Sequence, residues 1–536
     1  MRLPRSLCAA VLLLCSIPTT FASAYNARPK LVVVIVIDQF RGDYLERYRD
    51  QFGDSGFRVF LDRGAYFTDC NYDYANTRTA PGHATLVTGS YTSGHGIVAN
   101  EWWDPAKKKR VTSVEDDATK LVGAGKNGPG ASPHNLMSDT LGDELKLATG
   151  GKARVFAISL KDRAAVLPAG FSGDAAYWID PKSGDWITST YYRPDLPEWV
   201  RNFNGSHRAQ KFWNRDWKDS DGNTLGSTAP RNGKDGTPAG FYEVVGSTPF
   251  ANDYQLQFAK ELVLYEKLGA GPATDLLVIS LSANDILGHQ VGPDSPQMRS
   301  MALELDKSLA DFFGFLGHQV GMANVWMALS ADHGIAPLPE FAKTLRLPAA
   351  NLDSKALREQ INSLLSKKYA KKADYVLDLD YPLAWLSEDA FTGKKESDAE
   401  ADAGEAMKQA GLAGFFTKSQ LARGETPATE VGRRYAHSYS PEGGWYVIGI
   451  PTPFHVGITK GTDHATPFSY DTHVPLAFYG LAFQPGTYRT HAEPVDLAVT
   501  LASLLGINAP ALATGRVLTE AVQMPHHSTA PAGATQ

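Results

Sequence analysis

A nearly continuous run of β-branched residues, KLVVVIVI, extends from Lys30 to Ile37. Such a run is typical of a strand that is buried on both faces, as in a parallel sheet. Four further strand-like apolar runs follow at 153–160, 274–282, 323–330 and 474–479, and amphipathic helical patterns lie among them, including one at 494–507. This arrangement predicts an α/β fold, a three-layer α/β/α sandwich with a mostly parallel central sheet.

The 536-residue chain is long enough for one large α/β domain with insertions. We expect this domain to span residues 25–523. Two stretches break the strand pattern, at about 165–250 and 338–455, and we interpret both as inserted lobes. The segment 524–536 is rich in His, Ala and Pro, and we expect it to be a disordered tail.

Residues 1–24 have the organisation of a cleaved signal peptide. Arg2 and Arg5 precede an apolar stretch at 8–17, and an Ala-x-Ala cleavage site ends at Ala24. The sequence therefore predicts a periplasmic or secreted protein. Cys70 is then the one cysteine of the mature chain, so something other than disulfides must stabilise the protein, and a large core and bound metal could do so.

The formal charge of −6 becomes −8 when the two arginines of the signal are removed. Neither value indicates a nucleic-acid partner or an anionic membrane surface, and we expect neither. The oligomeric state does not follow from the sequence.

Polar side chains that could carry chemistry lie close to every one of the five apolar runs. In chain order they are Asp38, Lys161 and Arg163, Asp285 and His289, Asp332 and His333, and, ahead of the last run, His464 and His473. The carboxyl ends of parallel strands meet at the edge where open α/β sheets carry their sites. Taken singly, each of these residues has an ordinary alternative as a loop residue, a helix cap or a surface ion pair.

The stretch NTRTAPGH, from Asn76 to His83, precedes an apolar helical pattern. Proline is common at the first position of a helix, so Thr79 or Ala80 is expected to be the N-cap. A hydroxyl there lies among free N–H groups at the positive end of the helix dipole, which suits a group that holds or attacks a phosphate. The alternative is that Thr79 only caps the helix.

Asp285 and His289 are four residues apart, which places both on one face of a helix, a common way to present two ligands to one metal. Five acidic and imidazole side chains follow the strand ends, namely Asp38, Asp285, His289, Asp332 and His333. Thr79 and one of the two later histidines complete a set of three carboxylates, a hydroxyl and three imidazoles. Nitrogen and carboxylate ligands without thiolates suit two Zn²⁺ ions in a catalytic site.

The sequence resembles the alkaline phosphatase superfamily. It is most similar to the type I phosphodiesterase/nucleotide pyrophosphatase branch and, within that, to the bacterial phosphate-irrepressible alkaline phosphatases. The resemblance rests on VVVIVIDQFRGDYL, NTRTAPGHATLVTG, VANEWWD, SLKDR, SANDILGHQVGP, SADHG, GTDHATPFSYDTHVPLAFYG and PVDLAVTLASLLG, which occur in the family order over most of the mature chain.

This resemblance implies that Thr79 is the nucleophile and forms a phosphothreonine. One zinc would be held by Asp285, His289 and a C-terminal histidine. The other would be held by Asp38, Asp332, His333 and the Thr79 oxygen. We prefer His464 as the C-terminal ligand, because it matches the family position before Tyr-Asp and the final strand, and His473 is its competitor.

The resembling monoesterases carry an asparagine and a Lys-x-Arg pair at the positions of Asn100, Lys161 and Arg163. These groups would supply a hydrogen bond and two positive charges to the phosphoryl oxygens. We therefore expect an exported two-zinc alkaline phosphatase that acts on small phosphate monoesters. A phosphodiesterase or nucleotide pyrophosphatase with the same metals is the alternative, and a binding or structural protein without zinc is a further one.

Overall fold

The computed structural model describes residues 28–123, 129–233 and 236–523. The predicted signal peptide and the predicted tail from residue 524 lie outside the described residues. An eleven-stranded sheet forms the centre of the molecule. All five predicted strands belong to it, as β1 (Leu31–Ile37), β7 (Val155–Ser159), β12 (Asp275–Leu281), β13 (Val325–Ser330) and β20 (Leu476–Tyr479).

The strand order is β21-β2-β20-β13-β1-β12-β7-β8-β9-β5-β6. The remaining members are β2 (Ala65–Phe67), β5 (Glu115–Val122), β6 (Pro129–Ala131), β8 (Ala175–Ile179), β9 (Trp186–Ser189) and β21 (Gly486–Tyr488). The five central strands, β13 to β8, pair in parallel, whereas β20 and β9 join them antiparallel. The parallel part is the part whose strands are buried on both faces, as the β-branched run of β1 predicts.

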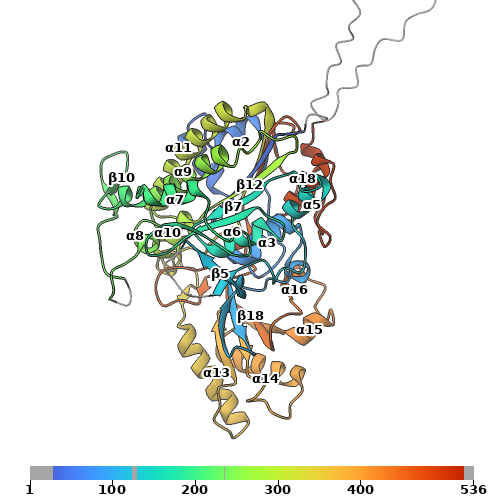
Figure 1. Ribbon diagram of the computed structural model, residues 1–536. Helices are drawn as coiled ribbons and strands as arrows, with labels where there is room; N and C mark the ends of the chain where they lie inside the picture. The colour runs from blue at the N-terminus through green and yellow to red at the C-terminus, as the bar shows by residue number, and fades with distance from the viewer. Residues whose placement is uncertain (1–27, 124–128, 234–235, 524–536) are drawn as a thin grey trace, which may run out of the picture.

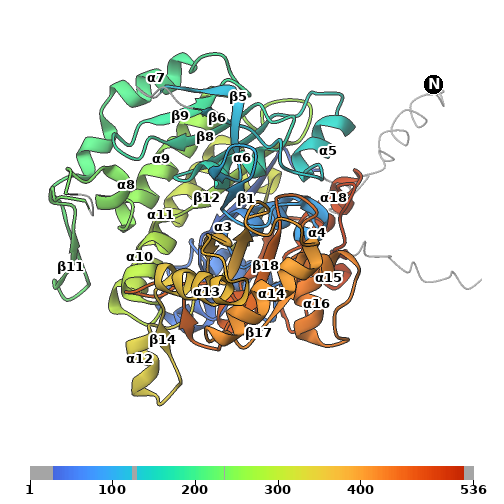
Figure 2. The same ribbon diagram turned by 90° about the horizontal axis from the view of Figure 1, so that it is seen from below.

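Helices cover both faces of this sheet, which makes the predicted three layers. One layer contains α3 (Thr79–Thr88), α5 (Leu141–Ala148), α6 (Asp162–Ala169) and α18 (Asp496–Leu505), and the other contains α9 (Pro249–Tyr265), α10 (Ala283–Val291) and α11 (Pro296–Gln319). Figure 2 shows α9 and α11 on one side of β12 and β1, with α5 and α18 on the other. Within the described ranges, none of the helices has the length and apolar character needed to span a bilayer.

The first predicted insertion, 165–250, needs a correction. Residues 175–179 form β8, which pairs in parallel with β7 and belongs to the central sheet, and β9 follows it antiparallel. The two strands were not predicted because the hydrophobic alternation of this Trp- and Tyr-rich region is weak. The part that projects from the sheet consists of α7 (Glu198–Gly205), the hairpin of β10 (Asp216–Lys218) and β11 (Thr224–Ser227), and α8 (Phe241–Val244).

The second predicted insertion, 338–455, contains a separate four-stranded sheet, which we call the lobe together with its helices. Its strands are β15 (Val376–Asp380), β16 (Leu383–Leu386), β18 (Tyr446–Ile450) and β17 (Gly414–Thr417), in that order. The predicted helices are present as α13 (Ser354–Lys368) and α14 (Glu396–Gln409). Figure 1 shows the lobe below the central sheet, with α13 and α14 at the end farthest from α11. The lobe has a core of its own, which includes Ile361, Ala403 and Val447.

One carboxyl group in the lobe is buried with only one of its two oxygen atoms hydrogen-bonded. The Glu400 side chain on α14 is fully buried, its Oε2 accepts the N–H of Ser419 at 3.0 Å, and its Oε1 has no hydrogen-bond partner. Burial, with Glu396 nearby, raises the pKa of Glu400 to about 7. The folded chain therefore holds this proton more tightly than the unfolded chain does.

This raised pKa makes the stability of the lobe depend on pH. Because the folded state binds more protons between about pH 4.5 and pH 7, the free energy of unfolding falls by about 3 kcal/mol as the pH rises through that window. Glu400→Gln is expected to abolish this fall, as measured by urea unfolding at pH 5 and pH 8.5. Glu405→Gln, on the same helix and 55% exposed, is the control and should leave the fall unchanged. An equal fall in wild type and Glu400→Gln would contradict the prediction.

Candidate functional site

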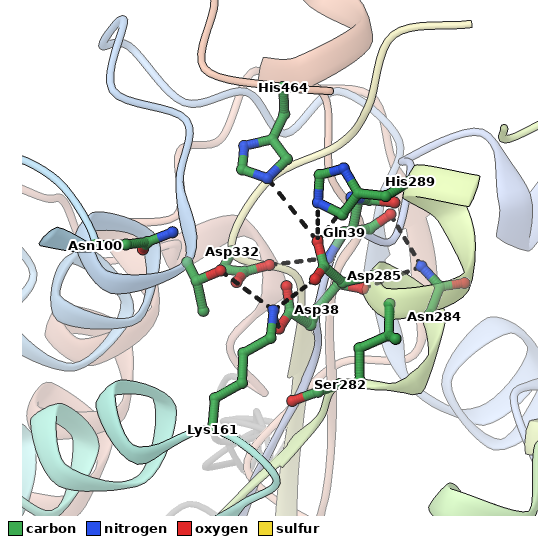
Figure 3. Close-up of polar contacts among 12 residues, drawn as sticks. Asp38, Gln39, Asn100, Lys161, Ser282, Asn284, Asp285, His289, Asp332 and His464 are labelled. Atoms are coloured by element: carbon green, nitrogen blue, oxygen red, sulfur yellow. Dashed lines mark hydrogen bonds and ion pairs between the residues drawn. The ribbon is translucent and has the colours of Figure 1, made fainter. Parts of the chain in front are cut away.

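The register of the parallel strands brings the predicted residues to one edge of the sheet. Ile37 pairs with Leu281, Val36 pairs with Ser330, and Ser280 pairs with Ser159, so the four central strands end level with one another. The polar side chains that follow these ends therefore lie together. Figure 3 shows them converging from four different strands.

Thr79 lies at the N-terminus of α3 and its side chain is buried. The expected N-cap, Thr79 or Ala80, was wrong by one or two residues: the cap is Arg78, which has an extended backbone, and Thr79 is the first helical residue, with Pro81 in the third position. The Arg78 side chain does not cap this helix end, so the first-turn N–H groups are left for other partners. The N–H of Ala80 donates to Oδ1 of Asn100 at 2.8 Å. Lys161 Nζ is 3.4 Å from the Thr79 hydroxyl oxygen.

Two groups of three side chains each offer ligand atoms within 4.8 Å of one another, which is close enough to hold a metal ion. The first group is Asp285, His289 and His464, and the second is Asp38, Asp332 and His333. In the first, the Nε2 atoms of His289 and His464 are 3.1 and 3.9 Å from Asp285 Oδ1. His473 lies elsewhere, with its Nε2 3.0 Å from the carbonyl oxygen of Thr68.

The second group contains buried polar atoms without hydrogen-bond partners. Oδ1 of Asp38, Oδ2 of Asp332 and Nε2 of His333 are inaccessible and make no hydrogen bond. Orphaned groups of this kind are rare because each costs its full desolvation free energy. Their convergence fits a bound cation, and the oxygen and nitrogen donor set suits zinc.

All three histidines are oriented in the same way. The Nδ1 atoms of His289, His333 and His464 lie 2.9, 2.9 and 2.6 Å from the carbonyl oxygens of Thr462, Gly334 and Thr77, respectively. A carbonyl oxygen can only accept, so each Nδ1 carries a proton and each Nε2 points into the site, where the neutral imidazole can offer a lone pair to a metal. Histidine ligands of metals are commonly fixed in this way by a backbone carbonyl.

The Lys161 side chain lies between the two groups (Figure 3). Its Nζ is 2.6 Å from Asp38 Oδ2 and 2.5 Å from Asp285 Oδ2. Burial alone lowers the pKa of Lys161, but these two carboxylates outweigh burial and raise it. One ammonium faces three buried carboxylates, and burial together with Asp285 and Asp332 holds the pKa of Asp38 well above its usual range. The Lys161 ammonium alone therefore does not balance the three carboxylates.

Gln39 is a site residue that the sequence analysis missed. It has a left-handed backbone with φ of 64°, which is rare outside glycine. Its N–H donates to Asp332 Oδ1 at 3.0 Å, and its Nε2 donates to Asp285 Oδ1 at 2.7 Å. Gln39 thus connects the two groups, and a glutamine after a strand carries no sequence signal for this role.

Asn100 and Arg163 line a cleft of about 250 Å³ beside His289 and His464. The Asn100 carbonyl accepts the Ala80 N–H, which leaves its NH₂ group able to donate to a ligand. Arg163 is 21% exposed, and Asp162, at 3.7 Å, is its ion-pair partner. The two cations of the predicted Lys-x-Arg pair thus occupy different places: Lys161 lies among the carboxylates, whereas Arg163 faces the cleft.

The chain is similar to proteins of one known family of phosphodiesterases and nucleotide pyrophosphatases. Residues 32–412 match the family described as type I phosphodiesterase / nucleotide pyrophosphatase, and the chain belongs to this family. Within it, the chain is 33% identical to the alkaline phosphatase PhoV of Synechococcus elongatus over 92% of this chain and 93% of that one. It is also 34% identical to a protein of Myroides odoratus named a calcium-transporting ATPase, over 94% and 96% of the two chains.

A third relative is the alkaline phosphatase PafA of Elizabethkingia meningoseptica, 33% identical over 92% of this chain and 95% of that one. The crystal structure of wild-type PafA superposes with a TM-score of 0.84 and covers 92% of this chain and 99% of PafA. A second PafA structure is of a variant with one threonine, one asparagine, one lysine and one arginine substituted. The alkaline phosphatase-like α/β fold expected from the sequence is therefore confirmed.

Proposed function

We propose that the chain is an exported alkaline phosphatase that hydrolyses phosphate monoesters through a phosphothreonine on Thr79. The observation that carries the proposal is the placement of Thr79 beside two three-ligand groups. Lys161 Nζ contacts the Thr79 hydroxyl and one carboxylate of each group, Asp38 and Asp285. The relatives PhoV and PafA, both named alkaline phosphatases, support it.

The two groups would each hold one Zn²⁺, the first with Asp285, His289 and His464, and the second with Asp38, Asp332, His333 and the Thr79 oxygen. When bound, the ions supply the positive charge that lowers the pKa of the attacking hydroxyl and stabilises the leaving oxygen. The buried atoms Asp38 Oδ1, Asp332 Oδ2 and His333 Nε2, which lack hydrogen-bond partners, support a cation in the second group.

The chain's own residues then perform the transfer. The Thr79 oxygen forms a bond to phosphorus as the bond to the alcohol oxygen breaks, and the alcohol leaves with a proton. Water next attacks the phosphothreonine, which releases phosphate and restores the hydroxyl. The NH₂ group of Asn100 and the cations of Lys161 and Arg163 would hold the phosphoryl oxygens during both steps.

Substrate class depends on how much charge these groups compensate. A monoester dianion carries more charge on its phosphoryl oxygens than a diester does, so the cations favour monoesters. The alternative, a phosphodiesterase or nucleotide pyrophosphatase, would use the same metal groups. The purified mature chain is expected to contain about two zinc ions and to prefer an aryl phosphate to its methyl diester. Diester preference with the same zinc would support the alternative instead.

Removing the two cations should change this preference. Lys161→Ala/Arg163→Ala is expected to lower kcat/KM for the aryl monoester by about 10³-fold, about 4 kcal/mol, and for the methyl diester by less than about tenfold. Zinc content must be measured in parallel, because Lys161 pairs with two proposed ligands. Arg163→Ala alone also tests the preference for monoesters, and it leaves the two proposed zinc ligands that pair with Lys161 undisturbed. Lys307→Ala, 70% exposed on α11, is the control. Equal losses on both substrates would refute the monoesterase assignment.

Export through the predicted signal peptide is part of the proposal. Cleavage after Ala24 would make Tyr25 the first residue of the mature protein. Its expected location is the periplasm or the medium, and small phosphate monoesters are its expected substrates.

A further inference from the structure

The four residues that lead into α3, Ala75 to Arg78, have no regular secondary structure, and we call them the pre-helix segment. The N–H of Ala75 and the side chain of Asn76 donate to Oγ and O of Ser438 at 2.7 and 2.9 Å. The Thr77 hydroxyl donates to the carbonyl oxygen of Thr466 at 2.9 Å. Every residue of the segment is buried, so these polar contacts are shielded from water.

Arg78 makes the largest set of contacts in this segment, and its side chain is only 4% exposed. Its Nη2 donates to the carbonyl oxygens of Asp380 and Tyr381 at 2.9 and 3.0 Å. Its Nε is 3.1 Å from Asp380 Oδ2. Asp380 and Tyr381 lie at the turn from β15 to β16, so one guanidinium joins the end of a lobe strand to the residue before Thr79.

The same turn borders the candidate site. Arg78, Asp380 and Tyr381 line the cleft that also contains His289 and His464. The carbonyl of Thr77, next to Arg78, accepts the Nδ1 proton of His464. A shift of the pre-helix segment would therefore move the Thr79 hydroxyl and the His464 ring together.

We propose that Arg78 is a positioning residue: it fixes Thr79 in the cleft by anchoring the pre-helix segment to the lobe. The proposal rests on the proposed function, because it takes Thr79 as the nucleophile. An arginine suits the task, since its planar fork reaches two carbonyls and a carboxylate at once, whereas a lysine presents a single point charge. The lobe thereby becomes part of the scaffold that holds the nucleophile.

The test compares Arg78→Ala and Arg78→Lys with wild type, using the holoenzyme and an aryl phosphate. A displacement of about 1 Å is expected to lower kcat by about 10²-fold in Arg78→Ala, with KM changed by less than about threefold. Arg78→Lys should remain at least about tenfold below wild type, because it cannot replace the fork. Zinc content should stay at the wild-type value, and millimolar guanidinium should restore kcat of Arg78→Ala.

Arg358→Ala is the matched control. Arg358 Nη1 donates to the carbonyl of Leu377 on the same strand β15 at 2.7 Å, but from within the lobe. Its kcat should equal that of wild type. A lowered melting temperature with wild-type kcat in both Arg78 variants would overturn the proposal, because a merely structural contact predicts that result. If Arg78→Ala does not fold, a wild-type kcat in Arg78→Lys would by itself overturn the proposal. An inactive wild type would instead refute the proposed function.

Discussion

Replacing Thr79 with alanine is expected to reduce kcat/KM for an aryl phosphate by at least about 10³-fold, equivalent to about 4 kcal/mol of transition-state stabilisation. The hydroxyl is the proposed nucleophile, and Thr79 is the first residue of α3, where it contacts Lys161. Without it, the two-step transfer has no covalent intermediate. Steady-state kinetics measures the loss, and acid quench followed by mass spectrometry should detect phosphothreonine in wild type and not in the variant.

Two variants separate this effect from damage to the helix. Thr79→Ser keeps a hydroxyl and should retain measurable turnover with a phosphoserine in place of phosphothreonine. Thr88→Ala removes a buried hydroxyl from the other end of α3, where it donates to the Ala84 carbonyl, and should leave turnover unchanged. Wild-type activity in Thr79→Ala, with unchanged zinc content, would show that another group attacks the phosphorus.

Removal of metal is expected to abolish activity and to destabilise the fold. Chelation leaves the carboxylates of Asp38, Asp285 and Asp332 buried, with the Lys161 ammonium in contact with Asp38 and Asp285. If free zinc exceeds the dissociation constant by about 1,000-fold, each ion contributes about 4 kcal/mol to stability. Dialysis against a chelator should therefore lower the melting temperature by several degrees, and added zinc should restore both melting temperature and activity.

Two histidine variants make the metal prediction specific. His464→Ala should reduce zinc content from about two ions to about one per chain, because it removes one of three ligands of the first group. His473→Ala should keep both ions, since His473 contacts the Thr68 carbonyl instead. Loss of one zinc ion in His473→Ala, with both ions kept in His464→Ala, would show that His473 is the ligand instead of His464. Unchanged activity and melting temperature after complete chelation would refute the metal site itself.

Four of the five parallel strands, and the sheet edge, were predictable from the sequence for one physical reason. A strand buried on both faces must be apolar throughout, so β1, β7, β12 and β13 stand out from their surroundings, and polar residues at their ends mark the edge. β8 and β9 were not predicted, because their alternation is weak in a region rich in aromatic residues. Their place in the sheet depends on the pairing of β8 with β7 and of β9 with β8.

Residues that act through distant partners were not predictable. Gln39 acquires its role from a left-handed backbone and from contacts with Asp285 and Asp332. Arg78 acquires its role from Asp380 and Tyr381, about 300 positions later in the chain. Neither residue type is a usual ligand or nucleophile, so no pattern in the sequence marks them. The predicted ligand residues, in contrast, follow strand ends and carry acidic or imidazole groups.

The wide separation of the residues within each ligand group along the chain has a consequence for biosynthesis. The first group joins Asp285 and His289 to His464, and the second joins Asp38 to Asp332 and His333, so the two groups together span residues 38–464. During synthesis, no fragment that ends before His464 can assemble both groups, so complete loading with metal has to wait until almost the entire polypeptide has emerged. For an exported chain, the ions would then be acquired after translocation, and their supply would be set by the zinc available outside the cytoplasm.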